Sequence, residues 1–162
     1  MQIELKERTE AHVRTYFAKT QDAEIRAMIP QTAETLEQAI VAFEKTLLPG
    51  ATSYGRTIYA DGEYVGDIWC YCINHVEEPN AMLSYCLFEK SLWGKGVATQ
   101  ALGKFLEEIV PQFELKTVGA FTYATNIPSV QVLLKNGFAE MEEFMEGGVL
   151  SKYLQRNTED ML

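Results

Sequence analysis

The chain has 162 residues, of which 23 are acidic and 14 are basic, and its formal net charge at neutral pH is −9. Proteins that bind nucleic acid usually present a basic face that displaces counterions from phosphates, so this balance argues against a nucleic-acid partner. Hydrophobic residues at 47% and charged residues at 23% are typical of a globular protein rather than a disordered one. We therefore expect residues 1–162 to form a single domain.

Features that report on the cellular compartment point to the cytoplasm. The first residues, Met1–Arg8, are charged and lack the apolar core of a secretory signal. No segment approaches the roughly 20 apolar residues that span a membrane. The cysteines Cys70, Cys72 and Cys86 are too few for a disulfide framework or a zinc site, so we expect buried free thiols and no metal.

The N-terminal part of the chain predicts one strand and two helices. Residues 2–8 form the strand, and Thr9 caps the first helix. Thr32 is the predicted cap of the second helix, and Pro49-Gly50 is its predicted end. At helical spacing, one face of this second helix carries the apolar residues Leu36, Ile40, Phe43 and Leu47.

A β region follows. Residues 56–60 and 64–73 are rich in β-branched and aromatic side chains and flank Asp61-Gly62, which is a hairpin turn signal. Residues 74–80 read as a polar loop, and 81–88 as a further strand. These segments predict three consecutive antiparallel strands.

The remaining elements alternate between helix and strand. A glycine-containing loop at 91–96 leads into a helix that Pro111 is expected to stop. Residues 117–123 form a strand, and 128–135 form a short helix that ends at Asn136-Gly137. The apolar residues Ala98, Leu102, Phe105 and Ile109 lie on one face of the helix that follows the glycine loop. Two last strands are predicted at 138–145 and 149–155, joined through 146–148.

The predicted order is β α α β β β α β α β β. The strand–helix–strand unit in the middle implies one parallel pair, and the hairpins on either side imply antiparallel neighbours. The fold class is therefore α/β (α+β), with a mixed, mostly antiparallel sheet of about seven strands and about four helices.

The segment Leu87–Thr99 carries the clearest sign of chemistry. A strand runs into Gly94 and Gly96, and a helix begins at once. The first turn of a helix has backbone N–H groups without partners, at the positive end of the helix dipole. Glycines allow an anion to approach that backbone closely, so this terminus is suited to a phosphate or a pyrophosphate.

Other interpretations of this loop compete with a pyrophosphate site. A Walker A loop needs Gly-x-x-x-x-Gly-Lys-Ser/Thr, and this arrangement fails because Gly96 follows Lys95. A dinucleotide fingerprint needs a third glycine where Thr99 stands. A tight turn without any ligand also fits the loop when it is considered alone.

A second motif, Asn126–Phe138, separates these interpretations. Together the two motifs resemble the GNAT superfamily of acetyl-coenzyme A-dependent N-acetyltransferases. The pyrophosphate loop of that family has the form Gln/Arg-x-x-Gly-x-Gly/Ala, and here Trp93, Gly96 and Ala98 take its first, fourth and sixth places. Trp-Gly-Lys-Gly-x-Ala-Thr, followed downstream by Asn-x-x-Ser-x-x-x-x-x-Lys-x-Gly-Phe, is particularly similar to the branch that acetylates ribosomal-protein N-termini.

The resemblance implies a binding mode for acetyl-CoA. Strands 81–88 and 117–123, a parallel pair at the centre of the sheet, would splay apart, and the pantetheine arm would lie between them. Backbone groups near Leu87 and Phe88 would bind that arm, and an N–H there would polarise the thioester carbonyl. Asn126 would contact the arm as well as cap its helix, and the pyrophosphate would be held by the loop residues Trp93, Gly94, Lys95, Gly96, Val97, Ala98 and Thr99.

The resemblance also implies the reaction, which is transfer of an acetyl group to a primary amine of a peptide N-terminus or a small molecule. Many relatives place a tyrosine acid four residues after the position of Ser129, but this chain has Leu133 there. Ser129, close to the sulfur, or Tyr123 would have to replace that tyrosine. Asp67 is the candidate base if it faces the cleft rather than solvent, and weaker candidates lie in the loop at His75, Glu77 and Glu78.

The residues leave the acceptor open. Tyr85 and Trp69 either line the acceptor cleft or belong to the core. Because the usual acid is missing and no base is obvious, an idle acyl-CoA-binding domain is the alternative function, and another kind of nucleotide-binding domain is a weaker one. Exposed edge strands are compatible with a monomer or a homodimer.

Overall fold

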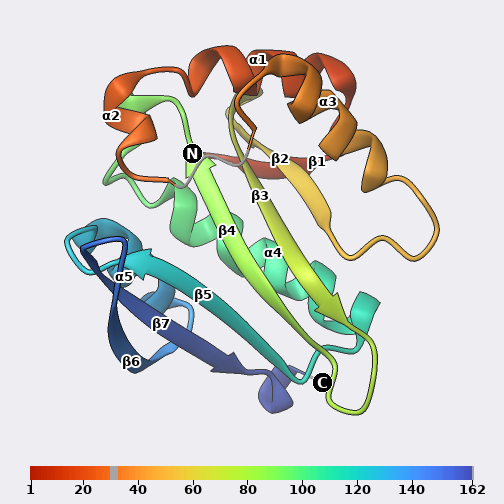
Figure 1. Cartoon of the computed structure of the whole chain (residues 1–162), viewed down its shortest axis with the longest axis vertical. Helices are drawn as coiled ribbons and strands as arrows, with labels where there is room; N and C mark the ends of the chain where they lie inside the picture. Colours follow the sequence, from red (N-terminus) through yellow and green to blue (C-terminus); the bar gives the residue numbers. More distant parts are fainter. Residues whose placement is uncertain (30–32, 162) are drawn as a thin grey trace.

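The computed structural model describes residues 1–29 and 33–161. Its strands form one sheet in the order β1-β2-β3-β4-β5-β7-β6, in which β4 and β5 are parallel and all other neighbours are antiparallel (Figure 1). The predicted fold class is confirmed. The strands are β1 (Ile3–Lys6), β2 (Tyr54–Ala60), β3 (Glu63–Asn74), β4 (Asn80–Leu87), β5 (Thr117–Tyr123), β6 (Ala139–Glu146) and β7 (Val149–Asn157).

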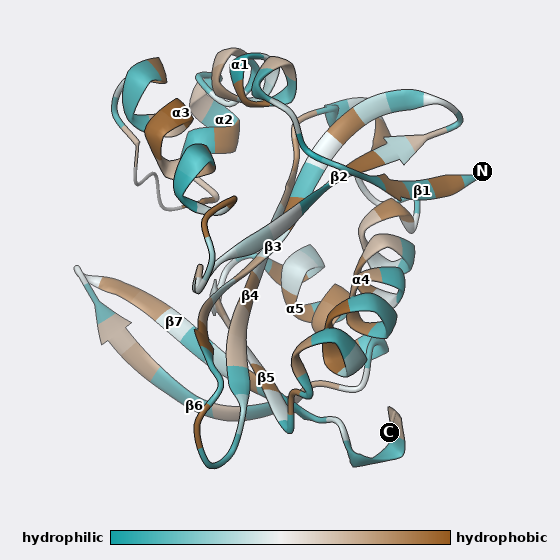
Figure 2. Cartoon of the chain, turned by 90° about the vertical axis from the view of Figure 1, so that its right-hand side faces the viewer, coloured by the Kyte–Doolittle hydropathy of each residue, from teal (hydrophilic) through white to brown (hydrophobic). Residues whose placement is uncertain are grey.

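Helices cover both faces of the sheet. Helices α4 and α5 lie on one side, and α1–α3 lie on the other, over the N-terminal strands (Figure 2). Within the described ranges there are five α-helices rather than the predicted four, because the single-turn helix α2 carries too few residues to show a periodic pattern. The helices are α1 (Glu10–Lys19), α2 (Ala23–Arg26), α3 (Leu36–Lys45), α4 (Val97–Phe113) and α5 (Ile127–Lys135).

The N-terminal helices begin at polar caps. The Thr9 N–H donates to Nδ1 of His12 at 3.0 Å at the start of α1, as predicted for a cap at Thr9. The predicted cap Thr32 lies outside the described residues. Helix α3 begins after Thr35, whose hydroxyl accepts the N–H of Gln38 at 3.2 Å, so the cap of this helix is Thr35.

Two helix ends differ from the prediction. Helix α3 ends at Lys45, before Pro49-Gly50, and Leu47 is therefore 65% exposed instead of belonging to the inward face. Helix α4 continues through Pro111 to Phe113. Proline removes one hydrogen bond but does not clash fatally in a last turn, and the N–H of Leu115 closes the helix by donating to the Val110 carbonyl at 3.0 Å.

The turns follow the residues that favour them, with one exception. Asp61 and Gly62 both have positive φ, +48° and +83°, as the predicted hairpin turn requires. Cys72 also has positive φ, +52°, at a register shift in β3. This bulge turns Cys72 outward, so it is exposed rather than buried beside Cys70.

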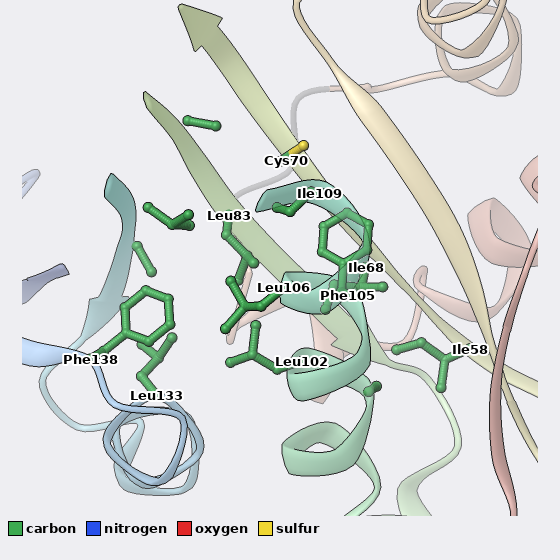
Figure 3. Close-up of a cluster of buried hydrophobic side chains, with 14 of the residues drawn as sticks. Ile58, Ile68, Cys70, Leu83, Leu102, Phe105, Leu106, Ile109, Leu133 and Phe138 are labelled. Atoms are coloured by element: carbon green, nitrogen blue, oxygen red, sulfur yellow. The ribbon is translucent and has the colours of Figure 1, made fainter. Parts of the chain in front are cut away.

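The core lies between the sheet and α4. Leu102, Phe105 and Ile109 have no exposed surface, as their predicted face requires, and Figure 3 shows them pointing at strand residues such as Ile68 and Leu83. Ala98, at the N-terminal end of the same face, is only half-buried. The packed face of α4 therefore fixes the position of its first turn, where a ligand could approach.

Candidate active site

The site is built on a gap in the middle of the sheet. β4 and β5 pair only at Asn80–Thr117, Ala81–Val118 and Met82–Gly119, although the strands run on to Leu87 and Tyr123. The predicted parting of these two strands is confirmed. A continuous ladder to the strand ends would have left no room for a ligand.

Backbone groups of both strands face this gap. The N–H of Phe88 donates to the Val65 carbonyl at 3.0 Å, so the backbone of Phe88 is turned toward β3. Because hydrogen-bonding direction alternates along an antiparallel strand, the N–H groups of Tyr85 and Leu87 point the other way, into the gap. By the same argument from the bond between the Ala124 N–H and the Leu150 carbonyl, the backbone of Phe121 faces the gap from β5.

The gap opens into a cavity of about 780 Å³. Its walls are the second halves of β4 and β5, the loop before α4, helix α5, residues around α2 and the turn between β6 and β7. Ile25, Met28 and Ile29 contribute an apolar part of the wall. Glu146 is the only carboxylate among the described lining residues, and Lys135 is the only cation.

The first turn of α4 forms one end of the cavity. Gly94 and Gly96 have φ of +76° and +82°, a left-handed conformation that favours glycine. The first helical hydrogen bond runs from the Gln100 N–H to the Gly96 carbonyl, at 3.1 Å. The N–H groups of Val97, Ala98 and Thr99 therefore have no partner within the helix and are available to an anion.

Trp93 ties this loop to the end of β4. Its indole Nε1 donates to the carbonyl of Leu87 at 3.0 Å. The bond occupies the Leu87 carbonyl and leaves the Leu87 N–H as the free group of that residue. Trp93 itself lines the cavity, so it contributes a ring as well as this connection.

Most of the predicted cofactor residues come together around the cavity. Phe88 and Lys95 do not line it. The N–H of Phe88 is already bonded to Val65, so of the two predicted carbonyl-polarising positions only Leu87 keeps a free N–H. The predicted residues that line the cavity are Leu87, Trp93, Gly94, Gly96, Val97, Ala98, Thr99, Tyr123, Asn126 and Ser129.

Helix α5 presents the predicted hydroxyl at the cavity. The Asn126 side chain caps α5 by accepting the Ser129 N–H at 3.3 Å. The Tyr85 hydroxyl, on β4, donates to Oγ of Ser129 at 3.3 Å, so Tyr85 belongs to the site rather than to the core alone. Leu133, one turn further along α5, is 2% exposed and has no proton to donate.

The structure separates Asp67 from these residues. The carboxyl is 1% exposed, lies 3.0 Å from the Arg8 guanidinium and accepts the Tyr64 hydroxyl at 2.6 Å. It does not line the cavity and is not a solvated strand end. Burial raises the pKa of Asp67 to about 6, because the cost of desolvating the carboxylate exceeds the opposing effects of Arg8 and Tyr64.

This pKa predicts a pH-dependent stability. The pKa of Asp67 in the folded state lies above its ordinary value of 3.8. Its contribution to the stability of the fold is therefore fully present below pH 3.8 and is lost as the pH rises through about 6. Two pKa units correspond to roughly 3 kcal/mol. We expect the difference in unfolding free energy between wild type and Asp67→Asn to fall by about that amount from pH 4 to pH 7, measured by urea denaturation. A constant difference would contradict the assignment.

The weaker base candidates lie elsewhere. His75, Glu77 and Glu78 are exposed in the loop that precedes β4, at the end where β4 is still paired with β5. Glu146 was not predicted. It lies at the end of β6 beside the turn Gly147-Gly148, and only the fold brings this turn to the cavity.

The backbone groups that line the cavity fit a thioester ligand with a diphosphate. The gap supplies free backbone groups for an extended amide-containing arm, and the start of α4 supplies N–H groups with no carboxylate among its first residues. No group of three or more His, Cys, Asp or Glu side chains within residues 1–29 and 33–161 is arranged to hold a metal ion.

Solved structures with this fold have been determined in complex with coenzyme A. A spermidine N-acetyltransferase from Vibrio cholerae in complex with CoA and spermine is 15% identical, with a TM-score of 0.85 over 99% of this chain and 98% of that one. The aminoglycoside acetyltransferase AAC(6')-Ib in complex with coenzyme A is also 15% identical, with a TM-score of 0.82 over 99% and 96% of the chains. No curated protein sequence matches the chain.

The family comparison covers most of the molecule. Residues 2–139 match the family described as acetyltransferase (GNAT) domain, and this range includes the gap, the loop before α4 and all of α5. The chain belongs to the GNAT family of acetyltransferases.

Proposed function

We propose that this acetyltransferase moves the acetyl group of acetyl-CoA to a primary amine by direct attack of the amine on the thioester. The observation that carries the proposal is the gap between β4 and β5, which leads to the uncapped N–H groups at the start of α4. A ligand that needs both features has a long polar arm joined to a diphosphate, as coenzyme A has.

The roles follow from the groups that face the cavity. The Leu87 N–H, prealigned in the gap, stabilises negative charge that develops on the thioester oxygen. Ser129 at the start of α5 faces the departing sulfur, and Tyr123 lines the same cavity as a second hydroxyl. A role for Asp67 stays a prediction, and its burial against Arg8 and Tyr64, outside the cavity lining, makes any such role indirect.

The acceptor is proposed to be a cationic primary amine. Glu146 is the only described carboxylate that lines the cavity, and it can hold an ammonium group and accept its proton. Two structural neighbours were solved with amines, spermine and the aminoglycoside kanamycin. The motif resemblance to ribosomal-protein N-terminal acetyltransferases makes a peptide N-terminus the other acceptor class.

The setting of the enzyme is also proposed. All three cysteines are free thiols, which favours a reducing cytoplasm. No described helix has the length and apolar character needed to cross a bilayer. The exposed edge strands β1 and β6 are compatible with either a monomer or a homodimer, which light scattering would distinguish.

The donor is tested by thermal unfolding. A ligand that binds only the folded state at 100 times its Kd adds about 2.7 kcal/mol of stability. For a chain of this size we expect acetyl-CoA to raise the Tm by roughly 5–10 °C. NADH at the same concentration is the control for another nucleotide, and a shift with NADH but not with acetyl-CoA would contradict the proposal.

The transfer itself is tested with a panel of amines. Release of free CoA thiol is measured with spermidine, kanamycin and short peptides with a free N-terminus. Turnover above the rate of thioester hydrolysis with any of them supports the proposal. Binding of acetyl-CoA without turnover on the whole panel would favour the idle acyl-CoA-binding alternative.

A further inference from the structure

We propose that Tyr85 is a positioning residue for the leaving sulfur: its hydroxyl donates to Ser129 and leaves the Ser129 proton free to bind the departing thiolate. The two oxygens are 3.3 Å apart, and both side chains line the cavity. The inference rests on the proposed function, because it assigns a part of that reaction to a residue on β4.

The place of this contact in the fold argues for a role in the reaction. Tyr85 lies beyond Met82, the last residue of β4 that pairs with β5. Its side chain shares a face with Leu83 and Leu87, on the side of the sheet where α5 lies. Among the described residues, the bond to Ser129 is the one hydrogen bond of the Tyr85 hydroxyl, and it crosses from the parted strand to the helix.

The position of Ser129 is fixed independently of Tyr85. Its backbone N–H is bonded to the Asn126 side chain, and it is the third residue of α5. The N-terminal end of a helix stabilises nearby negative charge and lowers the pKa of thiols. A thiolate released beside this turn therefore meets both the dipole of α5 and the Ser129 hydroxyl.

The direction of donation follows from the chemistry of the two hydroxyls. A serine hydroxyl has one proton and two lone pairs. Burial raises the pKa of Tyr85, so its hydroxyl stays protonated and remains a donor over the physiological pH range. When a Ser129 lone pair accepts from Tyr85, the serine proton is free for another acceptor, and Ser129 lines the cavity in which the sulfur is proposed to lie.

The pair stabilises the leaving group without giving up a proton permanently. The amine nitrogen forms a bond to the carbonyl carbon, the C–S bond breaks, and its electron pair stays on sulfur. A thiol pKa of about 8.5 lies below that of a tyrosine, near 10, so transfer of the Tyr85 proton to sulfur is unfavourable. The acceptor nitrogen loses two protons overall, one from the ammonium before attack and one as the amide forms. One of them balances the proton that the thiolate takes from water, and the other is the proton released overall.

The test is a double-mutant cycle on transfer to whichever amine the panel identifies. We expect Tyr85→Phe to lower kcat about 3–10-fold, as loss of one neutral hydrogen bond does, with the KM for acetyl-CoA changed less than about twofold. Ser129→Ala should lower kcat about 10–100-fold, because it removes a hydrogen bond to a charged group. In the double variant, kcat should equal that of Ser129→Ala alone.

Controls separate this pair from a structural effect. Tyr54→Phe removes a hydroxyl that donates to Glu108 at 2.9 Å outside the cavity, and it should leave kcat unchanged. CoA affinity by calorimetry reports whether each variant is folded, and Tyr85→Met replaces Tyr85→Phe in the cycle if the latter does not fold.

Each outcome has one meaning. A full additional loss when the Tyr85 change is added to Ser129→Ala would overturn the inference, as would unchanged kcat in Tyr85→Phe. If the wild type neither binds CoA nor releases thiol, the proposed function fails instead. Non-additive loss with preserved CoA affinity supports the positioning role.

Discussion

Replacing Gly96 by glutamate is expected to abolish CoA binding. The carboxylate would lie beside the N–H groups at the start of α4, where the diphosphate is expected. Two like charges about 4 Å apart at the surface repel by about 4 kcal/mol, which corresponds to a loss of affinity of roughly 1,000-fold. Calorimetric titration of CoA into the variant measures the effect.

The fold should tolerate this change. A Cβ at Gly96 meets no atom within 4 Å, and the φ of +82° costs a non-glycine residue about 1–2 kcal/mol. Gly50 is a matched control, since its φ is +77°, its surroundings are equally open and it does not line the cavity. Gly50→Glu should carry the same strain and charge and keep full CoA affinity. Equal affinity in both variants would place the diphosphate elsewhere.

The second large effect is expected at Gly66, where β3 supports the parted half of β4. A Cβ at this position would overlap the Cys86 carbonyl oxygen and lie 2.9 Å from Cα of Leu87. Both partners are backbone atoms, so relief requires β4 to move, and β4 has no strand on its other side at this level. Gly66→Ala should therefore push Leu87 into the cavity.

The expected result is a combined loss of stability and binding. Overpacking of this kind costs about 3 kcal/mol, which lowers the Tm by roughly 6–12 °C in a chain of this length. CoA affinity should fall as well, because the Leu87 N–H moves. Gly55→Ala on β2 is the control, because a Cβ there would lie 3.4 Å from Cβ of Trp69, an ordinary contact. A Tm and a CoA affinity equal to those of the wild type in Gly66→Ala would contradict the prediction, because β4 would then have moved without loss of stability or binding.

The sequence predicted those parts of the fold in which local signals and burial agree. The hairpin at Asp61-Gly62 was evident because both turn residues tolerate positive φ. The apolar face of α4 was evident because Leu102, Phe105 and Ile109 repeat at helical spacing and are all buried. The end of α4 was predicted wrongly at Pro111, since a proline in a last turn removes only one hydrogen bond.

The cofactor part of the candidate site was also accessible, because it depends on backbone N–H groups whose positions follow from glycine spacing and a helix start. The side chains of Asn126 and Ser129 were also identified, from the second motif, whereas the acidic group that lines the cavity was not. Asp67 resembled a possible base until the fold placed Arg8 and Tyr64 against it, and these residues are 59 and 3 positions away in the chain. Glu146 reaches the cavity through strand packing, which no spacing in the sequence encodes, and the sequence left Tyr85 open between the cleft and the core.

The short parallel ladder has a mechanical consequence. Only three residue pairs join the half-sheet β1–β4 to the half-sheet β5–β7 among the described residues. The hydrogen bonding between the two halves therefore stays incomplete until a ligand occupies the gap. The extended arm of a bound ligand that hydrogen-bonds to both β4 and β5 would take the place of the missing strand pairing. Ligand binding should therefore also make the middle of the sheet more rigid. Amide hydrogen exchange in the unpaired parts of β4 and β5, beyond Met82 and Gly119, should slow in both strands together on binding.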